Sequence, residues 1–331
     1  MPDYGLKDKT IAVGIVGTGY AAKKRAEAFI NHPSSKLIAV VGNTNSTTNE
    51  FCQAFNILAI DTYQELVNHP DIDLVCICNI NQDHGKIVRQ ALLADKHVIV
   101  EYPLTTDASE AEELIELAKT KEKLLHVEHI EIIGGVHQAI KKNIGEIGLP
   151  YLARYSTILA KKKKAPHWTY SYDQYAFPLI AALSRINRFT DLFGEVNRVS
   201  CFSRFWDAEI SGYFKACYCQ AQLQFQNQML VNITYGKGEI YKISDRTLEI
   251  YGDEGTLRFV GEKGTIVRGK EEIEIEVGSR RGLFNQDTKI VLDHLQNNTP
   301  LYIDNRQSAY SLKVADACEQ AYKQEKIISL I

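Results

Sequence analysis

A glycine turn near the N-terminus constrains the fold more than any other part of this sequence. Residues 11–16 form a short apolar run, Gly17-x-Gly19-x-x-Ala22 follows, and a helical pattern continues to about Ile30. Glycines at such a turn allow a tight bend and let the backbone approach a pyrophosphate, which then lies at the N-terminus of the helix. Because a strand pattern precedes the turn and a helix pattern follows it, we predict a dinucleotide-binding turn rather than an ordinary strand-to-helix connection.

Strand and helix signals alternate along the first 130 residues. Four further apolar runs are typical of strands buried on both faces, and stretches with apolar residues at helical spacing separate them. These runs are residues 36–42, 74–78, 97–100 and 124–127. The alternation predicts a doubly wound parallel sheet, whose ligand crevice lies beyond the carboxyl ends of the strands. Residues 79–84, 101–103 and 128–131 follow three of these strands and are therefore candidate site residues.

The end of the second predicted strand indicates which cofactor binds. Folds specific for NAD usually carry an acidic residue here, which holds the ribose hydroxyls of the adenosine. No acidic residue lies between Ser34 and Asn49, and Asn43-Thr44-Asn45-Ser46 offers neutral hydrogen-bonding groups instead. Such groups do not repel a 2′-phosphate, so we predict NADPH/NADP+ as the cofactor. The alternative is that residues 43–48 are only a polar loop near the site.

The sequence changes character after about residue 150. Three runs alternate apolar and polar side chains, as strands with one buried and one solvated face do. These runs are residues 220–226, 231–235 and 272–277. We therefore predict an α/β Rossmann domain over residues 1–130 and, over 131–331, an α+β substrate-binding domain with a large, mostly antiparallel open sheet. A helix from about Ala309 to Lys323 ends the chain, and whether it packs back on the first domain stays open.

Composition and charge exclude several classes of partner. The formal net charge of −3 at pH 7 argues against nucleic acid, and no apolar run approaches the roughly 20 residues needed to span a membrane. The N-terminus lacks the basic and apolar segments of a signal peptide, so we expect a cytoplasmic protein. The seven cysteines lack the nearby ligands of a metal site and are expected to be reduced packing thiols. A monomer and a homodimer both stay open.

Three motifs together give a family resemblance. Gly17-Thr18-Gly19, Asn81-x-x-His84 and the run Lys96-His97-Val98-Ile99-Val100-Glu101-Tyr102-Pro103 resemble the Gfo/Idh/MocA oxidoreductases. The resemblance implies a dinucleotide-binding domain followed by an open antiparallel sheet. The chain departs from the family pattern at catalytic positions. Tyr102 stands where the family has lysine, and Ile180 and Ser184 stand where it has aspartate and histidine.

These departures bear on the substrate. Oxidation of a sugar hydroxyl needs a general base, and neither Ile180 nor Ser184 can serve as one. Within the family the chain is similar to the bilin-reducing members over most of its length, which implies that NADPH delivers a hydride to the central methine carbon of biliverdin and gives bilirubin. The resembling segments are residues 13–27, 124–138, 153–157, 177–194, 235–239 and 278–288. The alternatives are a sugar or diol dehydrogenase and a non-catalytic regulator that senses a dinucleotide.

The resemblance also implies the residues that bind the cofactor. It places Asn81 and His84 beside the cofactor, Glu101 at the nicotinamide ribose and Tyr102 near the nicotinamide. The alternatives are a helix N-cap for His84, a structural carboxylate for Glu101 and simple packing for Tyr102. For the peptide bond before Pro103, both the cis and the trans form stay open. The full predicted cofactor-binding set is Gly17, Gly19, Tyr20, Ala21, Asn43, Thr44, Asn45, Ser46, Asn79, Asn81, His84, Glu101 and Tyr102.

Arg185 is the leading predicted catalytic and substrate-binding residue. It lies next to the family's catalytic position, in a segment that we expect to be a helix facing the crevice. Because arginine holds its proton too tightly to act as a plain acid, we assign it electrostatic stabilisation, a clamp on a propionate, or positioning of a proton-donating water. The alternative is an arginine paired with Asp191 or Glu195. Arg188, one turn further, is a second candidate for substrate binding.

Residues after the last strand of the first domain complete the predicted site. His129 and Glu131 are expected to share one face of an extended segment, and the ordinary pKa of histidine suits His129 to proton transfer. We predict that both bind the substrate and that His129 joins Arg185 and Tyr102 as a catalytic residue. A buried structural histidine is the alternative. The basic run Lys161–Lys164 either gathers propionates or forms a solvated loop.

Overall fold

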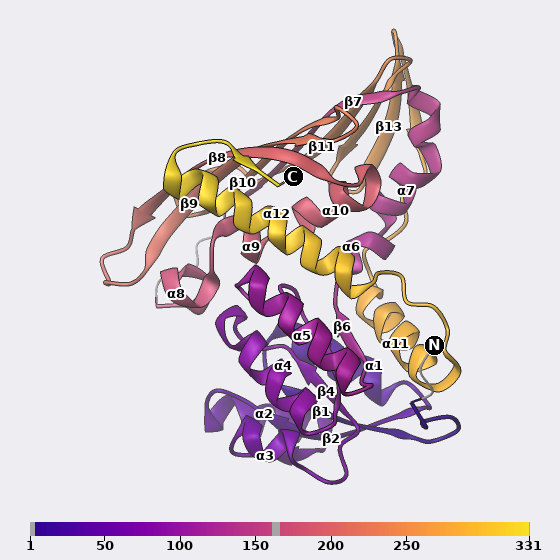
Figure 1. The fold of residues 1–331 in the computed structure, drawn as a ribbon, viewed down its shortest axis with the longest axis vertical. Coiled ribbons are helices and arrows are strands. Elements are labelled where there is room, and N and C mark those ends of the chain that lie inside the picture. The colour runs from indigo at the N-terminus through magenta and orange to yellow at the C-terminus, as the bar shows by residue number, and fades with distance from the viewer. Residues whose placement is uncertain (1–3, 161–165, 331) are drawn as a thin grey trace. The chain divides into compact units, whose positions relative to one another are not determined.

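The computed structural model describes residues 4–160 and 166–330 of the chain (Figure 1). It divides into two compact units, which are described separately. Unit 1 comprises the residues up to Ile130 together with Gly282–Ala309, and unit 2 comprises Glu131–Arg281 together with the residues from Tyr310. The lysine run from Lys161 to Lys164 lies outside the described residues.

Unit 1 is built on a six-stranded sheet in the order β3-β2-β1-β4-β5-β6, with every neighbouring pair parallel. The strands are β1 Ile11–Val16, β2 Ser35–Val41, β3 Leu58–Ala59, β4 Leu74–Ile77, β5 His97–Val100 and β6 Leu125–Val127. The helices are α1 Tyr20–Ile30, α2 Asn45–Phe55, α3 Tyr63–Val67, η1 Asn81–Asp83, α4 His84–Leu93, α5 Ala108–Thr120 and α11 Leu283–Asn297. This arrangement confirms the predicted doubly wound parallel sheet.

The central strands of unit 1 are apolar along their whole length because helices cover both faces of the sheet. Every residue of β4 and β5 is buried, and Val13 and Ile15 of β1 have no exposed surface. The elements that differ from the prediction include α2 and β3. Asn45–Phe55 forms a helix, whereas the sequence was interpreted as a polar segment, and the two-residue strand β3 was too short to be recognised.

Unit 2 is built on a nine-stranded sheet in the order β14-β13-β12-β11-β7-β10-β9-β8-β15. Only β7 and β10 pair in parallel, which confirms the prediction of a mostly antiparallel sheet. The strands are β7 Pro150–Leu159, β8 Val196–Asp207, β9 Phe214–Phe225, β10 Leu230–Gly238, β11 Asp245–Gly252, β12 Thr256–Val260, β13 Lys263–Arg268, β14 Glu271–Ile275 and β15 Ile328–Ser329.

Helices cover one face of this sheet, with α9 packed on β9 and α10 on β10. Along β9 the alternation is clear, since Ala221 and Leu223 have no exposed surface whereas Gln220 and Gln222 face solvent. The helices of unit 2 are α6 Ile130–Ile133, α7 Gly135–Asn143, η2 Ile144–Ile147, η3 Trp168–Tyr170, α8 Tyr172–Tyr175, α9 Pro178–Ala181, α10 Ser184–Phe193 and most of α12 Asn305–Gln324.

The chain passes between the units three times, after Ile130, Arg281 and Ala309. The first of these points is the predicted boundary. The prediction assigned everything after it to the second domain, whereas α11 lies in unit 1. Its side chains Val291, Leu292 and Leu295 belong to the same apolar core as β1 and α1, which explains why this late segment is part of the first unit. No helix in residues 4–160 and 166–330 is long and apolar enough to cross a membrane.

Candidate active site

The two glycines of the opening turn have different structural roles. Gly17 has φ +117°, and a Cβ there would lie 2.6 Å from the carbonyl oxygen of Cys78. It is therefore required for the turn itself and for its close passage along β4. Gly19 precedes α1, and a Cβ there would meet no atom within 4 Å. The first turn of α1 carries no acidic residue, so open space and unpaired amide groups meet at a helix N-terminus that suits an anion.

The N-terminus of α2 provides the neutral groups predicted to favour NADP. Thr44 caps the helix, because its hydroxyl accepts a hydrogen bond from the amide of Thr47 at 3.3 Å. Asn43, Asn45 and Ser46 are exposed beside it, and Asn45 and Ser46 lie in the first helical turn rather than in a loop. The role of these residues in cofactor binding stays a prediction. The nearest acidic residue of α2 is Glu50, which accepts a hydrogen bond from Ser46 Oγ at 3.2 Å.

His84 ties together the loops that follow β4 and β5. Its Nδ1 donates to the carbonyl oxygen of Pro103 at 2.7 Å, and its Nε2 lies 3.4 Å from the carbonyl oxygen of Asn79. Burial lowers the pKa of His84, so the ring is neutral. Asn81, also buried, begins the short helix η1 just before it. The N-cap alternative for His84 is wrong, because Asp83 occupies the cap position and His84 is the first residue of α4. The peptide bond between Tyr102 and Pro103 is cis.

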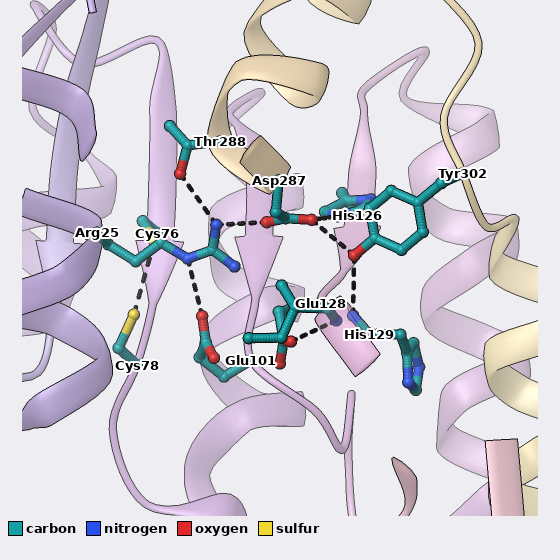
Figure 2. A network of polar contacts seen from close by, with 11 residues as sticks. Arg25, Cys76, Cys78, Glu101, His126, Glu128, His129, Asp287, Thr288 and Tyr302 are labelled. Carbon is teal, nitrogen blue, oxygen red and sulfur yellow. Dashed lines mark hydrogen bonds and ion pairs between the residues drawn. The ribbon is translucent and has the colours of Figure 1, made fainter. Parts of the chain in front are cut away.

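Glu101 follows β5 and is held in place by a buried arginine. Arg25 Nε donates to Glu101 Oε1 at 2.9 Å, and Figure 2 shows the Arg25 guanidinium between Glu101 and Asp287. Arg25 also donates to Asp287 and, at 3.0 Å, to the hydroxyl of Thr288. Burial works against the charge of Arg25, but Asp287 and Glu101 outweigh it and raise its pKa well above the usual value. Glu101 keeps 14% of its side chain exposed, so it is fixed yet accessible to a ligand.

Asp287, on α11, connects this arginine to the end of β6. His126 Nε2 lies 2.8 Å from Asp287 Oδ1, and the hydroxyl of Tyr302 donates to the same oxygen at 2.6 Å. The Tyr302 oxygen in turn accepts the backbone amide of His129 at 3.0 Å. Although burial favours the neutral acid, Arg25 and His126 hold the pKa of Asp287 far below its ordinary value. These contacts form the buried network drawn in Figure 2.

Glu128 is a buried acid that the sequence-based site did not include. It is 2% exposed, and its carboxyl accepts the amide of Ile130 at 2.6 Å. Burial, with a further contribution from the charge of Glu101, raises the pKa of Glu128 well above its ordinary value. Glu128 therefore stays protonated to a higher pH than an exposed glutamate does. Its place directly after a strand was a usable signal, since residues 128–131 were among the candidate positions.

His129 is buried and neutral, which corrects its predicted role as an acid. Its ring stacks on Tyr102 with centroids 5.6 Å apart and an interplanar angle of 7°. Its Nε2 lies 2.8 Å from the hydroxyl of Ser308, and burial lowers the pKa of His129 to about 3. The predicted extended segment is also wrong, because β6 ends at Val127 and Glu131 lies in α6. His129 and Glu131 therefore do not share a face, and they belong to different units.

In unit 2, Arg185 is the second residue of α10, which confirms the predicted helix. Its Nη1 donates to the hydroxyl of Ser184 at 2.9 Å, and its guanidinium carbon lies 5.5 Å from the ring centroid of Tyr235. The residues considered as its ion-pair partners are engaged elsewhere. Asp191 contacts His137 at 2.7 Å and Lys141 at 2.9 Å, and Glu195 accepts a hydrogen bond from Gln226.

Glu131 gathers several guanidinium groups. It contacts Arg188 at 3.1 Å, Arg246 at 3.2 Å and also Arg280. Burial opposes ionisation, but Arg188, Arg280, Arg246 and Arg185 outweigh it and lower the pKa of Glu131. We call Arg185, Arg188, Arg246 and Arg280 the arginine cluster. Four positive charges around one carboxylate leave the cluster strongly positive.

Some guanidinium N–H donors of the arginine cluster make no hydrogen bond to the described residues. Arg188 is 1% exposed, and its Nε and Nη1 have no hydrogen-bond partner among the residues that the structure describes. Buried guanidinium donors without partners are costly, so their arrangement suits an incoming anion. The positive charge of the cluster also acts on the neighbouring Tyr155. Burial alone would raise the pKa of Tyr155, but Arg185, Arg188 and Arg246 outweigh this effect and lower it.

Sequence reasoning found Arg185, Arg188 and Glu131 but missed Arg246 and Arg280. A signal existed for Arg246, because it shares one face of β11 with the buried Leu248 and Ile250. A charged residue on the apolar face of a strand indicates a buried partner. Arg280 lies between β14 and α11, and nothing in its local sequence marks it.

A parallel sheet with a phosphate-type glycine turn, followed in the chain by a second unit built on a mostly antiparallel sheet, is typical of a dinucleotide-dependent oxidoreductase. The model of the oxidoreductase family with an NAD-binding Rossmann fold matches residues 11–129. The model of the C-terminal alpha/beta domain of the same family matches residues 138–330. The chain therefore belongs to the Gfo/Idh/MocA oxidoreductase family.

Relatives with known names narrow the comparison. The crystal structure of biliverdin reductase from Synechocystis sp. PCC 6803, in complex with biliverdin and NADP+, is 50% identical with a TM-score of 0.94. The similarity covers 95% of this chain and all of that one. Biliverdin reductase A of Mus musculus is 26% identical over 288 residues, or 87% of this chain and 86% of the relative. The Homo sapiens enzyme is 30% identical over 199 residues, which span 58% of this chain and 62% of its own length.

Proposed function

We propose that this protein reduces biliverdin to bilirubin with NADPH. The observation that carries the proposal is the 50% identity, over 95% of this chain, to a solved biliverdin reductase that holds biliverdin and NADP+. When bound, NADPH supplies a hydride to the central methine carbon, and a proton completes the reduction. The chain itself contributes the binding, alignment and electrostatic stabilisation of the reacting groups.

The residues of unit 1 fit the cofactor. Open space at Gly19 and the acid-free first turn of α1 suit the diphosphate, and the exposed neutral groups around Thr44 suit a 2′-phosphate. Glu101, fixed by Arg25, is placed to accept hydrogen bonds from ribose hydroxyls. We assign these roles to the other residues of the predicted cofactor-binding set. For Tyr102, whose ring stacks on that of His129, we favour the alternative of a packing role.

The arginine cluster fits the carboxylates of a bilin. Biliverdin carries two propionates, and the cluster provides four guanidinium groups against the single carboxylate of Glu131. A hydrogen bond between charged groups contributes about 1.5–3 kcal/mol, enough to orient the substrate. In this assignment Arg188, Arg246 and Arg280 hold propionates, and Arg185 stabilises charge that moves onto the ring system during reduction.

The dehydrogenase alternative lacks its general base. Ile180 is 1% exposed and apolar, and the Ser184 hydroxyl accepts a hydrogen bond from Arg185. Neither group can take a proton from a sugar hydroxyl at neutral pH. We also propose that the protein acts in the cytoplasm, as a monomer or homodimer without a nucleic-acid partner. Seven free thiols and a net charge of −3 support this.

A colour change tests the proposed function. Purified protein mixed with NADPH and green biliverdin should yield yellow bilirubin, followed by absorbance. Absence of conversion across a range of pH would refute the proposal, and it would leave the non-catalytic regulator as the better hypothesis.

Arg185→Ala should lower turnover at least about tenfold, because a charge-assisted contact of about 1.5–3 kcal/mol is lost, while affinity for NADPH stays within about twofold. Arg204→Ala is the matched control, since Arg204 is an exposed residue of β8 and its guanidinium carbon lies 4.8 Å from the ring centroid of Trp206. Equal turnover of the two variants would remove Arg185 from the site.

A further inference from the structure

The guanidinium of Arg185 lies over the ring of one tyrosine, and that tyrosine is hydrogen-bonded to a second one. Its guanidinium carbon lies 5.5 Å from the ring centroid of Tyr235, on β10. The hydroxyl of Tyr235 lies 2.7 Å from the hydroxyl of Tyr175, which ends α8. Both tyrosines are buried, at 4% and 6% exposure. A ring held at its hydroxyl end cannot tilt freely, so the face that it offers to Arg185 is fixed.

A buried lysine contacts the ring of one of these two tyrosines. Lys237 is 4% exposed, and its ammonium lies 3.2 Å from the ring centroid of Tyr175, 4.6 Å from that of Tyr170 and 5.3 Å from that of Phe214. It also donates to the carbonyl oxygen of Thr169. Burying an ammonium is costly unless such partners compensate. The lysine therefore holds the segment that carries Tyr170 and Tyr175 against β9 and β10.

We propose that Tyr235, Tyr175 and Lys237 form a support that positions Arg185 for the reduction. The inference rests on the proposed function and deepens it. An arginine side chain carries about 2 kcal/mol of rotamer entropy, so a guanidinium already held on a fixed ring loses less on meeting its substrate. Tyr235 is the positioning residue in contact with Arg185, and Tyr175 and Lys237 act through it.

Single-atom deletions test the support in the assay with biliverdin and NADPH. Tyr235→Phe and Tyr175→Phe each remove one hydroxyl of the pair and keep the ring. Each should lower kcat about tenfold, the equivalent of one hydrogen bond, while KM for NADPH stays unchanged. Tyr251→Phe is the matched control, because Tyr251 also lies under an arginine, Arg154 at 5.5 Å, and donates through its hydroxyl to Glu249. It should retain the kcat of the unaltered protein.

A second measurement does not depend on turnover. In protein without ligands, the side-chain ¹⁵Nε signal of Arg185, assigned through Arg185→Lys, should be sharp. Exchange should broaden it in Tyr175→Phe and Lys237→Met, whereas Lys237→Arg, which keeps the cation, should restore it. Unchanged signals, or kcat values within about twofold of those of the control, would overturn the inference. A protein that never reduces biliverdin would refute only the proposed function, and the NMR result would still decide the support.

Discussion

Arg25 shows how one buried charge can set the geometry of a binding site. It has no exposed surface, and its partners come from β5 and from α11. The desolvation of a guanidinium is repaid only when carboxylates surround it, here Glu101 and Asp287. The residue proposed to meet the cofactor ribose is therefore held by a buried network that continues from Arg25 through Asp287 to His126 and Tyr302.

Asp287→Asn should destabilise the protein by about 3–5 kcal/mol, because it leaves a buried cation with one carboxylate fewer. The free energy of unfolding in urea measures the effect. Asp293→Asn, on the same helix, is the control, since Asp293 only pairs with the exposed Lys289 and should cost about 0–1 kcal/mol. Equal losses in the two variants would contradict the central role of Asp287.

Glu128 should make stability depend on pH in the opposite sense to a salt-bridged acid. Its pKa is raised in the folded state, so its contribution is fully present below the unfolded pKa of about 4.3 and is lost as pH rises toward the folded pKa. Glu128→Gln cannot ionise. Between pH 5 and 7, the variant should gain up to about 1.4 kcal/mol per pH unit relative to the unaltered protein in urea titrations. A difference that does not change with pH would show that Glu128 is ionised when folded.

At the residue scale the sequence predicted part of the candidate site. Arg185 could be found because it lies beside a motif position, and Glu101 because it ends a strand. The low pKa of His129 could not, because burial in the folded unit causes it, with a further contribution from His126. Its contact with Ser308, 179 positions away in the chain, likewise exists only in the folded unit. Arg246 lies opposite Thr157 in the strand ladder, and only the folded sheet brings it to Glu131.

At the scale of elements, the two glycines of the opening turn should affect different properties, one the stability of the fold and the other the binding of the cofactor. Gly17→Ala should cost about 1–3 kcal/mol of stability, because φ +117° and the carbonyl of Cys78 both oppose a side chain. Gly19→Ala should leave the urea midpoint nearly unchanged, since no protein atom is near. Its methyl group would instead fill the space assigned to the diphosphate and weaken NADP+ binding at least about tenfold, measured by calorimetry. Unaltered NADP+ affinity in Gly19→Ala would refute that assignment.

The elements that sequence reasoning predicted best were those with a strong period. Buried parallel strands are continuous apolar runs, whereas strands of unit 2 alternate apolar and polar residues. Each pattern therefore indicates whether one face or both faces of the strand are buried. Helix α2 was missed because its first turn is entirely polar, and its only clear start signal is the capping Thr44. Helix α11 was missed because the change to alternating strands concealed a return to helical spacing after residue 282.

At the scale of the whole molecule, cofactor binding should stabilise the protein by mass action. NADP+ at about 100 times its Kd should add about 2.7 kcal/mol and raise the melting temperature by roughly 5–10 °C. NAD+ at the same concentration should raise it less, because no acidic residue between Ser34 and Asn49 holds its ribose hydroxyls. Differential scanning fluorimetry measures both shifts. Equal shifts would contradict the predicted preference for NADP.

The division into units was only partly visible in the sequence. The change to alternating strands after about residue 150 indicates a second domain, although the first boundary lies earlier in the chain, after Ile130. The return of residues 282–309 leaves no such mark, because its ties to unit 1 are apolar side chains of α11 in the core and hydrogen bonds to Arg25, His126 and His129. Long-range contacts of this kind are properties of the folded chain rather than of any local pattern.

The split of unit 1 also affects how the chain is made. Arg25 leaves the ribosome 262 residues before Asp287, which at about 5–20 residues per second is a delay of roughly 10–50 s. Throughout that interval the nascent unit lacks one of the two carboxylates that pair with its buried guanidinium, and it also lacks the apolar residues of α11. The part of the protein that is synthesised first therefore completes its core only after nearly all of the intervening unit has emerged.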